Sequence, residues 1–172
     1  MSQITFHSAL DPFHATFRLL RLHPLIYSAG PLYLDHLRIL DFYLRFPFAL
    51  AKLRLKNEHR NIRAWSKSTK VPKPYGQSPD NKNLFERMFP AQHAALLTLC
   101  NTGHYEYSES TGKLLAKLKA IDPELNTRIS EVNESESELQ EFLKILVTEY
   151  PLLGRDGLKD RSGLLEYRYD AA

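Results

Sequence analysis

The sequence predicts an α+β protein that is mainly α-helical, with N-terminal helices around a buried central helix. Two observations carry this prediction. Apolar residues recur at helical spacing through most of the chain, most clearly in residues 34–46 and 139–150. Alternation typical of a half-buried strand is confined to short stretches of the C-terminal half, such as residues 165–169. Short helices with a turn-rich strand pair make this half winged-helix-like, although several small α+β folds share the pattern.

The central helix is the most informative stretch of the chain. Wound at about 100° per residue, its polar side chains fall within a sector of about 120°, and the rest of its girth is apolar, which is typical of a buried helix. These polar side chains are Asp35, Arg38, Asp41 and Arg45. Their i,i+3 and i,i+4 spacing predicts two acid–base pairs, the first two residues together and the last two together. Such a stripe is either a set of exposed helix pairs or a partner-binding seam, and the seam is our hypothesis.

Caps and prolines place the elements on either side. The acid–proline pair at residues 11–12 predicts an N-cap followed by proline at the first helical position, and this helix is expected to stop at Pro24. Pro47 is expected to end the central helix, with residues 48–55 continuing as a second helical piece.

Periodicity fades after residue 56, and four prolines and glycines follow between residues 72 and 79. The chain therefore divides into residues 1–56 as an N-terminal helical part, residues 57–78 as a basic, proline-containing connector, and residues 79–172 as a helical part with a C-terminal strand.

Basic and acidic residues are concentrated in different stretches of the chain. Eight basic residues and one acid lie between residues 52 and 73, whereas seven acids and one base lie between residues 122 and 141.

The basic connector has two interpretations that the sequence leaves open. It could contact a nucleic-acid backbone, with Trp65 and Tyr75 available for stacking, or it could be a solvated linker that needs no partner. The candidate nucleic-acid-binding residues are Lys56, Arg60, Arg63, Lys67 and Lys70. Phosphate contacts by these side chains would position the protein on double-stranded DNA without specifying a sequence.

Several shorter elements are expected in the second half. The predicted elements are helices over residues 79–89, 90–101 and 111–121, a strand over residues 104–108, an N-cap at Asp122, a capping box of Ser135 with Glu138, an amphipathic helix over residues 139–150 and a strand over residues 165–169.

No active site is assembled in the sequence. No glycine precedes a Lys-Ser or Lys-Thr pair in the frame of a phosphate-binding loop, and no histidines form a zinc-ligand pair at i,i+4. Cys100 is the single cysteine of the chain, so an internal disulfide is excluded. It follows apolar residues and is expected to be a buried, inert thiol. We therefore expect no catalytic residue, no metal and no cofactor. The N-terminus lacks the features of a signal peptide, and charges interrupt every long apolar run, so we expect a cytoplasmic protein.

Three segments carry a resemblance to a known family. They are DPFHATFRLLRL at residues 11–22, LDHLRILDFYLRFP at residues 34–47 and RSGLLEYRY at residues 161–169. Together they resemble the middle component of the ABC three-component conflict systems, the Lamassu-type anti-phage and anti-plasmid defence operons. These motifs are structural signatures, so no catalytic residue is implied by them.

The resemblance implies a non-enzymatic adaptor subunit that bridges an SMC-like ABC ATPase and an effector nuclease on foreign DNA. The alternative is a free-standing winged-helix DNA-binding regulator. An adaptor is expected to be encoded beside a large coiled-coil ATPase gene, whereas a regulator has no such requirement.

Overall fold

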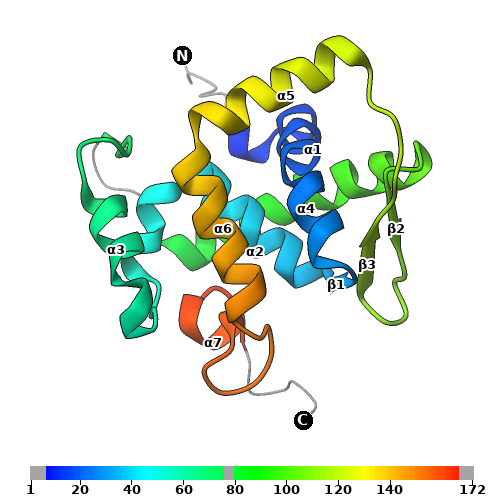
Figure 1. Cartoon of the computed structure of the whole chain (residues 1–172). Coiled ribbons are helices and arrows are strands. Elements are labelled where there is room, and N and C mark those ends of the chain that lie inside the picture. Colours follow the sequence, from blue (N-terminus) through cyan, green and yellow to red (C-terminus); the bar gives the residue numbers. More distant parts are fainter. Residues whose placement is uncertain (1–6, 76–79, 167–172) are drawn as a thin grey trace, which may run out of the picture.

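A computed structural model of the chain describes residues 7–75 and 80–166, and within them the protein is mainly helical with one small antiparallel sheet (Figure 1). This confirms the predicted α+β, mainly helical class. The α-helices are α1 (Pro12–Ala29), α2 (Leu34–Arg45), α3 (Arg60–Lys67), α4 (Asn81–Asn101), α5 (Pro123–Ser135), α6 (Ser137–Glu149) and α7 (Leu158–Ser162). The 3-10 helices are η1 (Ser8–Leu10), η2 (Pro47–Lys52) and η3 (Asn57–His59). The strands are β1 (Leu32–Tyr33), β2 (Tyr105–Tyr107) and β3 (Lys113–Ala116).

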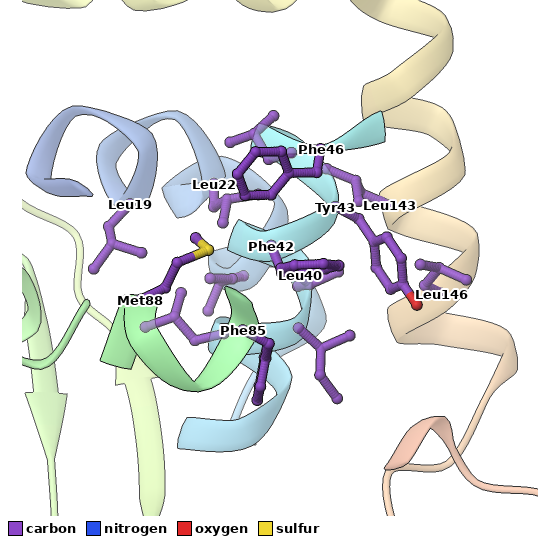
Figure 2. Close-up of a cluster of buried hydrophobic side chains, with 14 of the residues drawn as sticks. Leu19, Leu22, Leu40, Phe42, Tyr43, Phe46, Phe85, Met88, Leu143 and Leu146 are labelled. Carbon is purple, nitrogen blue, oxygen red and sulfur yellow. The ribbon is translucent and has the colours of Figure 1, made fainter. Parts of the chain in front are cut away.

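Helix α2 lies in the middle of the hydrophobic core, as its sequence predicts. Leu40 and Phe42 are completely buried, and α1, α4 and α6 surround the helix (Figure 2). Phe42 meets Phe85 of α4 edge to face, with ring centroids 5.8 Å apart, while Tyr43 points toward α6. Apolar residues from both predicted helical parts, before and after the connector, therefore join one core cluster.

Two prolines lie inside long helices, contrary to the sequence prediction. Helix α1 begins as expected, because the Asp11 carboxylate accepts a hydrogen bond from the His14 backbone N–H at 2.9 Å, but it continues through Pro24. Likewise α4 runs unbroken through Pro90, where two helices were predicted. An internal proline costs about 3 kcal/mol. Burial of apolar side chains on both sides of each proline, such as Leu22 and Ile26 in α1, offsets that cost.

The sheet differs from the prediction in one strand. Strand β2 lies where a strand was expected, but the predicted helix over residues 111–121 is wrong, because residues 113–116 form β3. Gly112, at a φ of +66°, turns the chain, and β3 then pairs antiparallel with β2 and with β1 in the order β1-β3-β2. Leu114 and Ala116 face the core while Lys113 faces solvent, so a short alternating pattern overrides helical spacing here.

The remaining elements adjust the sequence prediction at their ends. Asp122 caps α5 as expected, and α6 is the predicted amphipathic helix. The capping box is wrong, because Ser135 still belongs to α5 and its hydroxyl donates to the Val132 carbonyl at 2.8 Å. The predicted tail strand lies mostly outside the described residues, and Leu165 and Glu166 are in no strand. The β2–β3 hairpin precedes α5 and α6, and a winged-helix arrangement is not confirmed.

Helix α7 is fastened to the segment that follows η2. The Arg54 N–H donates to the Arg161 carbonyl at 3.1 Å, and Arg161 Nη1 donates to the Arg54 carbonyl at 2.8 Å. Arg54 Nη2 also lies 2.7 Å from Oδ1 of Asp160. Two segments that are far apart in sequence are thus hydrogen-bonded to each other at this edge of the fold.

The predicted connector is helical over part of its length, since η3 and α3 lie within it. Figure 1 places α3 on the opposite side of the molecule from the β2–β3 hairpin. Among the described residues, no helix combines the length and apolar character needed to cross a membrane.

Candidate functional site

The charged stripe of α2 points largely into the protein. The Asp41 side chain is fully buried and accepts two hydrogen bonds from Arg18 of α1, at 2.6 Å from Nε and 3.0 Å from Nη2. Gln92 of α4 donates to the second carboxylate oxygen at 2.9 Å. Such a bidentate, fully satisfied pair fixes the relative positions of three helices. Asp41 is therefore an internal residue and presents no surface to a partner.

The first predicted pair of the stripe is confirmed. Arg38 Nη1 lies 3.2 Å from Asp35, and Lys159 of α7 approaches the same carboxylate at 3.1 Å. The Arg38 guanidinium also stacks over Phe85 and Phe89 of α4, at 4.4 and 4.7 Å from their ring centroids. Asp35 keeps about a quarter of its side chain exposed (27%), so this end of the stripe is the accessible one.

The second predicted pair is replaced by other contacts. Arg45 was expected to pair with Asp41, but its Nη2 donates to the Ser8 hydroxyl at 3.0 Å and its guanidinium lies 4.9 Å from the Phe46 ring centroid. Both carboxylate oxygens of Asp41 already accept hydrogen bonds from Arg18 or Gln92. Arg45 is half-buried at the edge of a cavity.

Sequence reasoning missed Arg18 and Gln92 as the partners of Asp41. A signal for Arg18 was present, because this arginine lies in the apolar run of α1 and a buried cation requires an acid. The Arg18–Asp41 pair also joins residues 11–22 to residues 34–47, the two segments that carry most of the family resemblance. The pair accounts for one charged residue in each of these two segments.

The basic residues of the connector form a compact exposed face. Arg60, Arg63 and Lys67 fall within an arc of about 60° on α3, since they are spaced i, i+3 and i+7, and all three are exposed. The opposite side of this helix buries Ile62 and Ser66. The helix is therefore amphipathic, with cations outside, which explains why the charges and the faded periodicity occur together.

The other two candidates are tied to α6. Lys56 Nζ donates to the Glu149 carbonyl at 2.9 Å and lies over the Tyr150 ring, while Lys70 lies 3.5 Å from Glu138. Trp65 was predicted to be available for base stacking, but it is engaged within the protein. Its indole N–H donates to Glu138 at 3.2 Å, and its ring packs edge-on against Phe142. The stacking role can rest only on Tyr75, which is fully exposed.

No described part of the chain brings together three or more His, Cys, Asp or Glu side chains that could hold a metal ion. Cys100 is half-buried, and burial raises the pKa of its thiol above the ordinary range, with the charge of Glu106 adding to the effect. A raised pKa lowers the thiolate fraction and hence the nucleophilicity of the thiol.

The geometry describes a small helical protein whose buried charges hold its helices together and whose accessible charges lie on separate surfaces. Comparison with protein families then identifies it. The chain belongs to the ABC-three component (ABC-3C) system Middle Component 5 family, MC5, whose model matches residues 4–170. Comparison with curated proteins and with solved structures gives no match. The resemblance to the middle component of these systems is confirmed, and family membership implies that the chain works with the other subunits of such a system.

Proposed function

We propose that this protein is a non-enzymatic adaptor of a Lamassu-type defence complex, bridging an SMC-like ABC ATPase and an effector nuclease on foreign DNA. The single observation that carries the adaptor role is the family match across nearly the whole chain. A middle component that occupies one compact fold must meet its partners through surface patches. Two patches of different chemistry support the proposal, one basic and one partly apolar.

The basic patch is the exposed face of α3, formed by Arg60, Arg63 and Lys67. These cations face away from the core, so they can approach a phosphate backbone without any rearrangement of the helix. Each phosphate contact releases counterion, and affinity for double-stranded DNA should fall steeply as salt rises. We assign Lys56 and Lys70 a secondary part, because their ammonium groups already bond to α6.

The DNA part is tested by the variant Arg60→Gln/Arg63→Gln/Lys67→Gln. Its plot of log affinity against log salt should flatten by about three units at most, with unchanged sequence preference. The matched control replaces three exposed cations elsewhere, Lys113, Lys119 and Arg128, by glutamine. Equal slopes for the two triple variants would remove α3 from the DNA contact.

The second patch lies at the accessible end of the α2 stripe. Arg38, which pairs with Asp35, stacks on Phe89 of α4, and on this helix Phe89 and Leu97 are 38% and 40% exposed at i,i+8 spacing. Exposed apolar side chains beside a half-buried arginine are typical of a protein–protein contact. Arg45 remains a proposed partner contact at the other end of the stripe, whereas buried Asp41 serves only to position α2.

Co-purification with the ATPase and nuclease encoded beside this chain tests the second patch. Phe89→Ser/Leu97→Ser should lose at least one partner while remaining folded, because both side chains are already partly in water. Leu118→Ser, at an 86% exposed site in the segment that follows β3, is the control. Retention of both partners by the double variant would show that the contact lies elsewhere.

We further propose that the purified chain hydrolyses neither ATP nor DNA, since its described residues assemble no metal cluster. Sustained turnover by homogeneous protein would contradict this. The exposed face of α3 would also suit the alternative, a free-standing winged-helix regulator. High-affinity, sequence-specific DNA binding by the chain alone, without co-purifying subunits, would favour that alternative.

A further inference from the structure

A cavity of about 500 Å³ lies between α1, α2, η2 and the segment that follows α3. Most of its lining side chains are cationic or apolar, and Ser8 and Glu136 line it as well. The residues that matter for its chemistry are Phe17, Arg21, Arg45, Phe48, Pro72 and Lys73. Neither the basic face of α3 nor the patch on α4 contributes to it.

The cationic side of the cavity is only partly neutralised. Arg18 is paired with Asp41, and Arg21 is paired with Glu136 on the rim. For Arg45, in contrast, the described residues place no carboxylate within 4 Å, and its side-chain hydrogen bond goes to the neutral Ser8 hydroxyl. Two of the four cations are thus balanced by acids.

Lys73 is the fourth cation. Its ammonium group donates to the Lys67 carbonyl at 3.0 Å, which satisfies one N–H and leaves its charge uncompensated by that contact. A half-buried guanidinium is costly to desolvate unless an anion accompanies it. Burial lowers the pKa of Arg45, and the neighbouring charge of Arg18 lowers it further, while Asp41 opposes them. The cavity is therefore short of negative charge at Arg45 and at Lys73, both of which line it.

The apolar side supplies a different surface. Phe17 and Phe48 are partly buried and line the cavity together with Pro72, so they offer apolar surface to a flat ring. A volume of about 500 Å³ is larger than an inorganic anion requires and falls within the range of about 300–1,000 Å³ that is usual for small-molecule sites. The guanidinium fork of Arg45 suits phosphate oxygens, and a lysine adds a point charge.

We propose that this cavity binds a nucleoside monophosphate, with the phosphate on Arg45 and Lys73 and the base against Phe17 and Phe48. Glu136 does not oppose this placement, since its carboxylate is already engaged by Arg21. The proposal does not rest on the adaptor role, because it concerns a ligand of the chain without its partners, but it shares Arg45 with the partner contact proposed above.

Isothermal titration of the whole chain with each of the four 5′-ribonucleoside monophosphates tests the proposal. At least one should bind, and it should bind more tightly than inorganic phosphate and than the matching nucleoside. Lys73→Gln and Arg45→Gln should each weaken that binding about tenfold or more, the effect expected for loss of one charge-assisted contact. Arg128→Gln, an exposed cation on α5, is the control and should bind as the unchanged chain does.

Several outcomes would overturn the proposal. Absence of binding by all four nucleotides at millimolar concentration would do so, and so would equal affinity for inorganic phosphate, which would indicate a simple anion site. Equal weakening by the Arg128 and Lys73 variants would place the ligand elsewhere. Because Lys73 is exposed, its variant keeps the test informative even if the Arg45 variant unfolds. Nucleotide binding should also raise the melting temperature of the unchanged chain in a concentration-dependent way.

Discussion

The charged stripe of α2 and the basic face of α3 contain similar residues but differ in role: the first is largely buried and stabilises the fold, and the second is exposed to solvent. On α2, Asp41 is enclosed by Arg18 and Gln92, and its charge holds helices together. On α3, Arg60 and Lys67 point to solvent from a helix that buries its other side. The comparison teaches that a cation's role depends on whether an acid from another helix meets it. Substitutions in the first region should change stability, and those in the second should change binding.

The largest expected effect comes from Asp41→Ala, which leaves the Arg18 guanidinium buried without its carboxylate. Loss of one partner of a buried pair costs about 3–5 kcal/mol of unfolding free energy. Asp35→Ala, at the partly exposed end of the same stripe, should cost less, about 1.5–3 kcal/mol, because water reaches a quarter of this side chain and can solvate the two cations that it leaves. Urea denaturation of the two variants measures the difference. Equal losses would break the proposed contrast between the two ends of α2.

The apolar side of α2 should be nearly as sensitive. Leu40→Ala or Phe42→Ala should lower the unfolding free energy by about 2–5 kcal/mol, because each empties a completely buried site. Leu118→Ala, at an exposed site, serves as control and should change stability by less than about 0.5 kcal/mol. A thermal midpoint unchanged in the α2 variants would show that this helix is not central to the core.

A pH effect of intermediate size is expected at the N-terminus of α2. Burial lowers the pKa of His36 to about 4, with the charge of Lys159 adding to the shift and Asp35 opposing it. Its Nδ1 accepts the Tyr33 backbone N–H at 3.2 Å, which requires an unprotonated nitrogen. Between pH 6.5 and 4 the unfolded chain binds the proton and the folded chain does not. Stability should therefore fall, by up to about 3 kcal/mol, as pH drops through this window.

The titration of His36 is measured by urea denaturation between pH 7.5 and 4.5. His36→Asn should flatten the dependence, whereas Leu118→Ser, which removes no titratable group from an exposed site, should leave it unchanged. Some slope should persist in the first variant, because burial also lowers the pKa of His7 and His104. Identical pH profiles for the unchanged chain and the His36 variant would contradict the assignment.

The smallest effect on stability belongs to α3. Replacing Arg60, Arg63 and Lys67 by glutamine should change the unfolding free energy by no more than about 0.5 kcal/mol for each residue, as for other surface positions. Arg63 is the most sensitive of the three, since its Nη2 donates to the Leu53 carbonyl at 3.0 Å. A cooperative loss of several kcal/mol in thermal or urea unfolding would mean that α3 is structural, like the α2 stripe.

Much of the fold was predictable from local pattern. The cap at Asp11, the burial of Leu40 and Phe42 and the amphipathic face of α6 all follow from spacing alone. The helix breaks at Pro24 and Pro90 were wrong, because tertiary burial outweighs the local cost of proline. Residues 113–116 were also mispredicted, since their strand depends on pairing with β1 and β2.

The candidate sites show the same limit. Spacing within α2 suggested that Asp41 pairs with Arg45, but the nearer partner comes from a helix 23 residues earlier. No pattern within one helix contains that information. The exposed face of α3 was easier to predict, because its charged residues have helical spacing. The helix itself was missed, because too few apolar residues lie opposite those charges.

The fastening of α7 has a consequence for synthesis of the chain on the ribosome. Arg161 follows Arg54 by 107 residues, so the backbone groups of Arg54 have no partners until 107 further residues have been translated. At elongation rates of about 5–20 residues per second, the delay lasts on the order of 5–20 s. During it, the nascent N-terminal helices leave this edge uncovered, and chaperone dependence should be greatest in that interval.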